Sequence, residues 1–214
     1  KEFYHCKMLL SDIKPPLNSA MQVFLPNEGY LVGELPQDLY NNLLNEGLDC
    51  EQRNKTRLTG LVTVDGDQTC PHYDVSEKNS KLLENFLGYY IDLYEQSFDY
   101  LSHFKILDRD IPLSFQTPWY NIQRPNDYLT GHSHNGVFSY TIWLKLPSKS
   151  VFTFIYSHVG GRTASESLEL KPEDNGKFII FPSSLYHEVP PYRSKNENEK
   201  RIAISGNIQF KSNE

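Results

Sequence analysis

The hydrophobic positions of this chain follow two different periods. Between about residues 77 and 104, apolar side chains recur at steps of three and four, which is typical of one face of a long helix. Ser76 stands directly before this segment and is expected to cap its first turn. Proline is favoured in the first turn of a helix and glycine at its end, so a shorter helix is predicted from Pro36 to Gly47. The broad apolar face of the long helix needs a sheet to cover.

From Ile111 onward the pattern is that of short strands separated by turns rich in Pro, Gly, Asn and Asp. The predicted strands span 115–123, 137–146, 151–158, 168–171, 177–181, 186–189 and 201–210, with further strands expected at 21–25, 29–32 and 58–64. Strands spaced in this way are typical of a sandwich or jelly roll. We therefore expect an all-β core with flanking helices (α+β), built as a cupin-like double-stranded β-helix. One domain, 1–214, is expected, with 1–110 as supporting strands and helices and 111–210 as the jelly-roll core.

Three histidines form the candidate metal site. His132 and His134 are separated by one residue, and side chains two apart on an extended backbone point the same way. Two imidazoles on one spot suit Fe, Zn, Cu or Ni. His187 is the candidate third donor, because the four strands predicted between it and His134 are enough for a barrel to bring the chain back. The remaining histidines are expected to be ordinary surface or core residues: His5, His72, His103 and His158.

Arg201 opens the last predicted strand, which alternates strictly. Ile202, Ile204 and Ile208 share one face, and Arg201, Ala203, Ser205 and Asn207 share the other. If the isoleucines pack against the long helix, the arginine faces the barrel interior. A buried guanidinium needs an anion, and arginine binds carboxylates through two parallel hydrogen bonds. An internal Asp or Glu partner, or an exposed position at the strand start, remains the alternative.

Together these features resemble the Fe(II)/2-oxoglutarate-dependent oxygenases. The shared features are His-x-His, the distal histidine in Phe-Pro-Ser-x-x-x-His-x-Val, and an arginine on the final strand. The segment 119–129 is similar to the strand and turn before the first ligand in the prolyl-hydroxylase-like branch. The segment 139–143 is similar to a Ser-containing strand of a bacterial and phage type that itself carries His-x-His. The resemblance covers roughly residues 115–210.

The resemblance implies roles for individual residues. His132 and His187 would be iron ligands, and Arg201 would hold the distal carboxylate of 2-oxoglutarate. Further cofactor contacts would come from Ser205, Asn121 and Trp143. Most of the superfamily has Asp or Glu where this chain has His134, so the iron would keep one more positive charge, which the dianionic cosubstrate could neutralise. Whether His134 or a water molecule fills that position stays open.

The implied activity is that of a dioxygenase acting as a hydroxylase. Fe(II), 2-oxoglutarate and O2 would yield succinate, CO2 and an oxidised substrate C–H bond. Gly160-Gly161 and the loop 194–200 are candidate lids. Two other functions remain. A three-His cupin such as a thiol dioxygenase partly fits Gly176, Pro182 and His187, although it gives Arg201 no role. A non-enzymatic jelly roll, in a carbohydrate-binding or virion protein, would bind no iron.

Composition narrows the partners and the location. The net charge is -6 and no basic patch stands out, which argues against a nucleic-acid partner. No apolar run approaches the ~20 residues that cross a membrane. Cys6, Cys50 and Cys70 are too few and too widely spaced for a disulfide framework. We expect a cytoplasmic protein, of a bacterium or of the host of a phage, that acts on a small molecule or a protein side chain. The sequence does not predict its oligomeric state.

Overall fold

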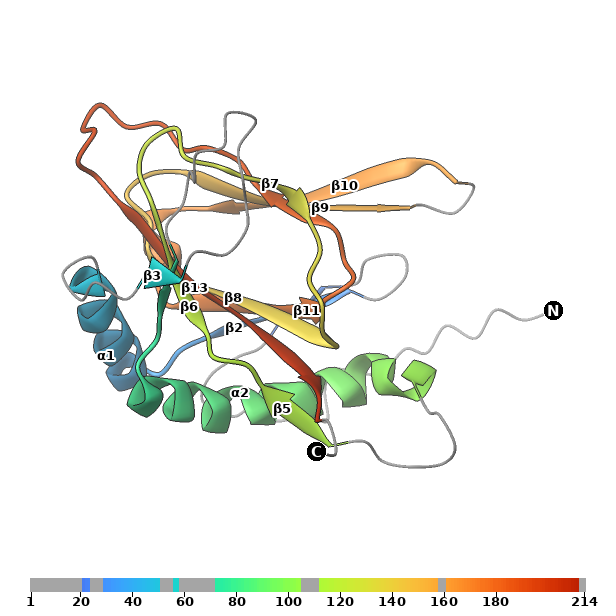
Figure 1. Ribbon diagram of the computed structural model, residues 1–214. Coiled ribbons are helices and arrows are strands. Elements are labelled where there is room, and N and C mark those ends of the chain that lie inside the picture. The colour runs from blue at the N-terminus through green and yellow to red at the C-terminus, as the bar shows by residue number, and fades with distance from the viewer. Residues whose placement is uncertain are drawn as a thin grey trace.

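The computed structural model describes residues 21–23, 29–50, 56–57, 72–104, 112–157 and 161–211. Two helices cover one side of a large sheet, and a smaller sheet faces its other side (Figure 1). The helices are α1 (Gln37–Leu48), α2 (Glu77–Phe98) and the 3-10 turns η2 (Tyr100–Phe104) and η3 (Pro172–Asp174). The strands are β1 (Met21–Val23), β2 (Tyr30–Glu34), β3 (Thr56–Arg57), β4 (His72–Asp74), β5 (Leu113–Phe115), β6 (Trp119–Gln123), β7 (Leu129–His132), β8 (Phe138–Lys145), β9 (Ser150–Ser157), β10 (Thr163–Leu170), β11 (Lys177–Pro182), β12 (His187–Val189) and β13 (Arg201–Phe210).

The two sheets form the expected jelly roll, or double-stranded β-helix. The large sheet has the order β1-β2-β11-β8-β13-β6-β4-β3, with β5 also paired to β13, and the small sheet has the order β10-β9-β12-β7. Strands from the N-terminal part of the chain extend the large sheet at both ends, because β2 pairs with β11 and β4 pairs with β6. The last strand, β13, lies between β8 and β6 in the middle of the sheet, so it can carry a side chain into the centre of the barrel.

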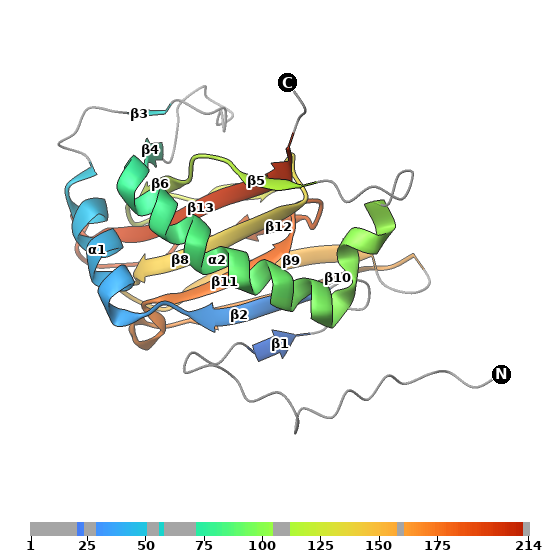
Figure 2. The same cartoon turned by 90° about the horizontal axis from the view of Figure 1, so that it is seen from below.

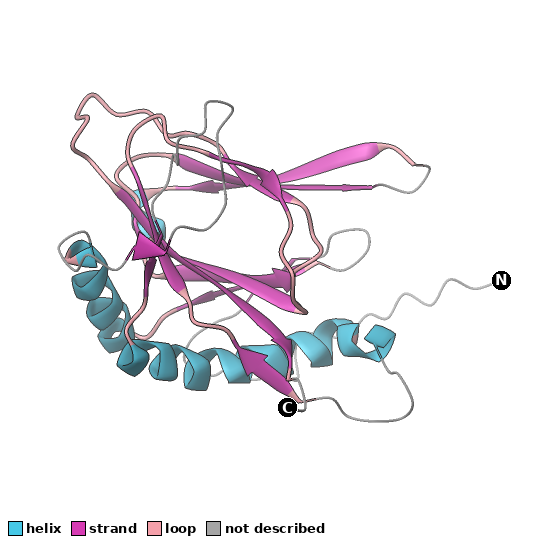
Figure 3. Ribbon diagram, viewed as in Figure 1, coloured by secondary structure: helices cyan, strands magenta, loops and turns pink. Residues whose placement is uncertain are grey.

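Two apolar cores follow from the alternation of side chains on the large sheet. On β13, Ile202, Ile204 and Ile208 belong to the core beneath the helices, as the sequence predicts. Ala203, on the opposite face, belongs to the core between the sheets. Figure 2 shows α2 running across the outer face of the sheet, and Figure 3 shows both helices on that side alone. The helices therefore close the outer face and leave the inner face for the site.

The start of α2 is fixed from two directions. The Ser76 hydroxyl accepts a hydrogen bond from the Asn79 backbone N–H at 3.4 Å, which confirms the predicted cap. Glu46, near the end of α1, accepts hydrogen bonds from the Ser76 N–H at 2.7 Å and the Ser76 hydroxyl at 2.8 Å, and also one from the Asn79 side-chain amide. A carboxylate is favourable at this end because the helix dipole is positive there. The contact ties the two helices together under the sheet.

Several predicted boundaries are wrong, for local reasons. The long helix ends at Phe98 and not at residue 104, because Asp99 adopts a left-handed conformation (φ 49°, ψ 37°) and the chain continues as η2. The predicted strand 115–123 is two strands, β5 and β6, and Pro118 between them has no N–H to give to a sheet. The shorter helix ends at Leu48, one residue after Gly47.

The other differences lie at a hairpin and outside the described residues. β10 begins at Thr163, five positions before the prediction, because its first half is polar and exposed and lacks a strand-like apolar pattern. The strand expected at 58–64 falls outside the described residues. Cys50 is buried, and its thiol donates a hydrogen bond to the Glu46 carbonyl oxygen at 3.4 Å, whereas Cys6 and Cys70 lie outside the described residues. No helix within the described part of the chain is long and apolar enough to cross a membrane.

Candidate metal centre and active site

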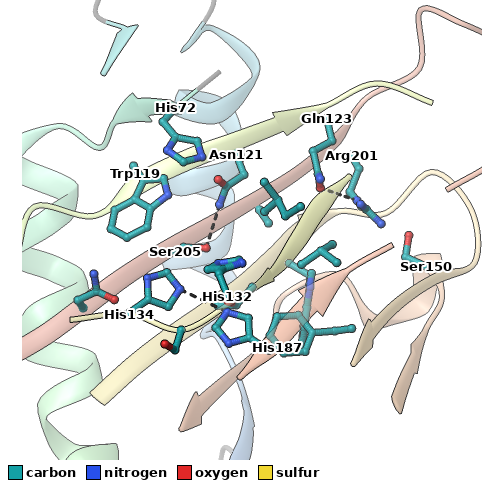
Figure 4. A pocket seen from close by; sticks show the side chains of 18 of the residues that line it. His72, Trp119, Asn121, Gln123, His132, His134, Ser150, His187, Arg201 and Ser205 are labelled. Carbon is teal, nitrogen blue, oxygen red and sulfur yellow. Dashed lines mark hydrogen bonds between the residues drawn. The ribbon is translucent and has the colours of Figure 1, made fainter. Parts of the chain in front are cut away.

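Three imidazoles from two segments meet at the open side of the barrel. His132 ends β7, His187 begins β12, and the two residues are direct partners across this strand pair. His134 lies two residues beyond His132, and its Nε2 is 3.3 Å from Nε2 of His187. One ring nitrogen from each histidine lies within 4.8 Å of the others (Figure 4). The structure thus brings together the three residues that the sequence singles out as metal ligands.

Backbone carbonyls fix the orientation of two of the rings. Nδ1 of His132 is 2.6 Å from the Thr130 carbonyl oxygen, and Nδ1 of His187 is 2.9 Å from that of Leu185. A carbonyl oxygen only accepts hydrogen bonds, so Nδ1 carries the proton in each ring and Nε2 keeps its lone pair. Histidines that bind metals are usually held in this way. The lone pairs are therefore available at the centre of the cluster.

Two of the imidazoles are held in the neutral form that a metal ligand requires. Burial lowers the pKa of His134 to about 4, with smaller contributions from His132 and His72. Burial also lowers the pKa of His187 to about 3; the hydrogen bond to Leu185 opposes this, and the neighbouring histidines add to it. The ring of Phe152 stacks on His187 at 5.2 Å between centroids, and this apolar contact helps to exclude water.

The spacing of the cluster fits a divalent transition metal. Bonds of about 2.1 Å place neighbouring ligand atoms about 3 Å apart, near the 3.3 Å between His134 and His187. The three ligand atoms lie within 4.8 Å of one another, so the rings would draw together on binding one ion. A neutral set of three imidazoles suits Fe, Zn, Cu and Ni alike.

A buried hydrogen-bond chain supports the loop that carries His134. The N–H of His134 donates to the Ser183 carbonyl at 2.9 Å, and the Ser183 N–H donates to the Val137 carbonyl at 3.0 Å. The Ser139 hydroxyl donates to Oδ1 of Asn207 at 2.9 Å, so the Ser183 hydroxyl must donate to Ser139, 2.8 Å away. The chain links β8, β13 and the turn after β11. It holds the His134 loop against the large sheet.

A cavity of about 560 Å³ connects the histidines with Arg201. The residues singled out from the sequence all line it: Asn121, His132, His134, Trp143, His187, Arg201 and Ser205. Arg201 is only 2% exposed, so the alternative of an exposed position at the strand start is wrong. Its Nε donates to Oε1 of Gln123 at 2.8 Å, and one terminal nitrogen donates to the Pro190 carbonyl at 3.1 Å. The guanidinium also lies over the Tyr192 ring, 5.1 Å from its centroid.

The middle of the cavity carries a polar pair and an indole. The side-chain amide of Asn121 donates to the Ser205 hydroxyl at 2.9 Å. Ala203 is the strand partner of both Asn121 and Trp143, so these two side chains flank it on the inner face of the large sheet. Figure 4 shows Asn121 and Ser205 joined by this hydrogen bond, close to the histidines. A ligand that bridges the histidines and the guanidinium would pass these groups.

Two polar residues of the cavity stand out among those that the sequence prediction left out. Gln123 holds Arg201 and stands two residues after Asn121, so the alternation of β6 could have revealed it. His72 was expected to be an ordinary surface or core residue. It is buried, yet it lines the cavity, with its ring 5.8 Å from that of Trp119. Neither the hydrophobic periodicity nor a motif predicts β4, the strand that carries His72. No signal in the sequence therefore places His72 in the cavity.

A family match covers the strands that carry this site. Residues 117–207 match the family model described as "Putative 2OG-Fe(II) oxygenase". Over this segment the chain is similar to the Fe(II)/2-oxoglutarate-dependent oxygenases. The matched segment contains the three histidines and Arg201. In sequence, no curated protein matches this chain.

Solved structures share the fold of this chain at low sequence identity. A prolyl-4-hydroxylase from Pseudomonas putida is 14% identical, with a TM-score of 0.57 over 86% of this chain and 94% of that one. The epimerase SnoN from nogalamycin biosynthesis, solved with Fe3+, alpha ketoglutarate and nogalamycin RO, is 12% identical, with a TM-score of 0.57 over 86% and 80%. A viral collagen prolyl hydroxylase from Paramecium Bursaria Chlorella virus-1, in a 2-oxoglutarate complex, is 11% identical, with a TM-score of 0.51 over 86% and 96%.

The family match and the histidine cluster point to the same activity. Both are those of a non-haem oxygenase that uses Fe(II), 2-oxoglutarate and O2. The family match favours this activity over the three-His cupin and the non-enzymatic jelly roll. The cavity position of Arg201 agrees with this outcome, because a basic residue beside the metal site has a role in an enzyme that uses a dicarboxylate.

Proposed function

We propose that His132, His134 and His187 bind Fe(II) and that Arg201 binds the distal carboxylate of 2-oxoglutarate. The observation that carries this proposal is the meeting of three imidazole nitrogens in the same cavity as a buried guanidinium. When bound, the iron and the 2-oxo acid supply the oxidising chemistry that side chains lack. The protein contributes orientation, charge and the exclusion of water.

His134 takes the place of the usual carboxylate ligand in this proposal. Its Nε2 faces that of His187 at 3.3 Å, which supports a ligand role over a ring turned away with water in its place. Three neutral ligands leave both positive charges of the metal uncompensated. The first carboxylate of 2-oxoglutarate would offset part of that charge while the distal carboxylate pairs with Arg201, so both attractions would hold the cosubstrate.

The inner walls of the cavity are given distinct tasks. Gln123 and Tyr192 hold the guanidinium in one orientation, so that arginine loses little rotamer freedom on binding an anion. Asn121 and Ser205 lie beside the path of the cosubstrate, and Trp143 excludes water from it. A dry cavity strengthens every charge interaction inside it.

The substrate is proposed to be a small molecule or a protein side chain. Support comes from the cavity beyond His134, where the walls offer side-chain amides and the indole of Trp119 but no carboxylate within the described residues. A cytoplasmic location and a single domain belong to the same proposal. The shared large sheet, to which both parts of the chain contribute strands, supports the single domain. The loop 194–200 remains a candidate lid.

A succinate-release assay against substrate pools tests the proposal. Wild-type protein with Fe(II) and 2-oxoglutarate should release succinate, whereas His187→Ala should not. Arg201→Ala should keep the iron and raise the 2-oxoglutarate requirement at least about tenfold, or about 1.4 kcal/mol. Arg162→Ala, which removes an exposed arginine outside the cavity, serves as the matched control. Unchanged activity in either cavity variant would overturn the proposed roles.

A further inference from the structure

The side-chain nitrogen of Gln123 takes no part in holding Arg201, which contacts only the side-chain oxygen of this residue. Gln123 lies on β6 as the direct strand partner of Arg201 on β13, and its side chain lines the same cavity. Only 2% of the residue is exposed, as for Arg201 itself. Figure 4 shows the two side chains joined at the end of the cavity away from the histidines. A buried amide at this place must satisfy both its acceptor and its donors.

The contact with Arg201 determines which way the side-chain amide of Gln123 is turned. Nε of Arg201 lies 2.8 Å from the Gln123 side chain. A guanidinium has donors and no acceptor, so the glutamine atom that faces it must be the oxygen Oε1. The amide nitrogen of Gln123 must therefore point elsewhere, with two N–H donors. The usual ambiguity between oxygen and nitrogen in a glutamine side chain does not arise here.

That nitrogen is buried without a hydrogen-bond partner in the described part of the chain. Nε2 of Gln123 is shielded from solvent, and no acceptor within reach is found among the described residues. An unsatisfied buried donor costs about 1–3 kcal/mol. Such groups are rare in folded proteins, and the cavity that Gln123 lines is the place where a ligand could bring the missing acceptor.

We infer that Gln123 is a second binding residue for the distal carboxylate of 2-oxoglutarate, beside Arg201. The inference rests on the proposed function of this cavity. Gln123 gives its oxygen to Arg201 and its N–H groups to the carboxylate, so one side chain both orients the guanidinium and contacts the ligand. An amide adds donors without adding charge, which leaves the attraction between Arg201 and the carboxylate intact.

The surrounding charges agree with an anion at this place. Asp127 is a described carboxyl group close enough to Arg201 for the guanidinium to lower its pKa, although burial raises that pKa more strongly. Asp127 does not line the cavity, and its Oδ2 accepts a hydrogen bond from the Arg124 N–H at 2.7 Å. No described residue that lines the cavity carries a carboxylate, so an anionic group bound there would come from a ligand.

The first test compares two 2-oxo acids by calorimetry on Zn(II)-loaded protein. 2-Oxovalerate is the matched probe, because it carries a methyl group where 2-oxoglutarate has its distal carboxylate. Gln123→Met should raise the Kd of 2-oxoglutarate at least about tenfold and change that of 2-oxovalerate less than about twofold. Equal effects on the two acids, or no effect on either, would overturn the inference.

A second substitution separates direct binding from positioning. If Gln123 acts only by holding Arg201, it has no effect once the guanidinium is gone. Adding Gln123→Met to Arg201→Met should therefore still lower the preference for 2-oxoglutarate over 2-oxovalerate, by about threefold or more. An unchanged preference in the double variant would reduce Gln123 to a positioning residue and contradict the inference.

An experiment on the wild-type protein keeps the inference testable if these variants fail to fold. In Zn(II)-loaded, 15N-labelled protein, the side-chain amide signal of Gln123 should shift when 2-oxoglutarate is added and not with 2-oxovalerate. A signal that ignores 2-oxoglutarate contradicts the inference. If neither acid binds the wild-type protein, both the inference and the proposed function fail. If both acids bind and only the effects of Gln123 are missing, the inference fails and the proposed function stands.

Discussion

The Nε2 atoms of His134 and His187 face each other at 3.3 Å although 53 residues separate them in the chain. Four strands, β8 to β11, lie between the two histidines and return the chain to the place where it started. Because the proton of His187 is on Nδ1, its Nε2 accepts, and Nε2 of His134 donates the hydrogen in this contact. A metal bound at both nitrogens would replace this hydrogen bond, which is why the contact is central to the proposed site.

Loss of the distal histidine should remove the metal. His187→Ala takes away a buried ligand that Phe152 and Leu185 hold in place, so we expect Fe(II) affinity to fall by about 100-fold or more. The measurement is anaerobic Fe(II) titration. His72→Ala is the matched control, because it removes a fourth imidazole of the cavity that lies outside the ligand cluster. Equal loss in both variants would contradict the assignment of the ligands.

The metal-free protein should lose stability in mild acid. In the unfolded chain a histidine takes up a proton near pH 6.5, whereas the folded pKa is about 4 for His134 and about 3 for His187. The unfolded state therefore binds more protons as the pH falls below 6.5, and unfolding becomes easier. Each group contributes at most about 1.4 kcal/mol per pH unit.

Urea unfolding in the presence of a chelator measures this dependence. The urea concentration at the unfolding midpoint should fall as the pH is lowered from about 7 to about 4.5. In a double variant, His134→Asn with His187→Asn, this concentration should fall less steeply with pH. Protonation of carboxylates elsewhere is common to both proteins and cancels in the comparison. The same slope in the wild type and the double variant would show that the histidines are not held neutral by the fold.

The hydroxyl of Ser183 should matter for both stability and metal binding. Ser183→Ala removes the donor to Ser139 and weakens the chain that holds the His134 loop. We expect the free energy of unfolding to drop by about 1–3 kcal/mol and Fe(II) affinity to fall several-fold. The adjacent Ser184 is exposed, so Ser184→Ala is a matched control that should change neither. A stable Ser183→Ala protein with full affinity would show that the chain is dispensable.

The contact between α1 and α2 should affect folding and leave the site unchanged. Glu46→Ala removes the carboxylate that accepts from Ser76 and Asn79 at the start of α2, and should lower the free energy of unfolding by about 1–2 kcal/mol. Glu84→Ala is the control: it breaks only the exposed pair with Lys81 and should cost a few tenths of a kcal/mol. Weaker binding of 2-oxoglutarate to Glu46→Ala would indicate a link to the site that the fold does not suggest.

Local periodicity was enough to predict most of the architecture. The strict alternation of β13 predicts which face meets the helices, and the structure confirms it through Ile202, Ile204 and Ile208. The same alternation predicts that Arg201 faces the interior. The N-cap at Ser76 was predictable because its side chain acts on a backbone group only three residues away.

Features set by tertiary structure could not be predicted in the same way. His72 enters the cavity because β4 pairs with β6, a contact between segments with no shared sequence signal. The early end of α2 depends on the left-handed conformation of Asp99. The helical spacing of apolar residues continues past Asp99, so the sequence pattern does not indicate that the helix ends there. The alternation of β6 could place Gln123 on the inner face, but its contact with Arg201 also depends on the register of β6 with β13.

Anaerobic spectroscopy tests the central claim most directly. When 2-oxoglutarate is added to the Fe(II)-loaded protein without O2, we predict a visible charge-transfer band that His187→Ala lacks and that Arg201→Ala shows only at a higher 2-oxoglutarate concentration. Wild-type protein that binds Fe(II) but shows no band, or a band that survives in His187→Ala, would contradict the claim that these side chains bind the iron and the cosubstrate together.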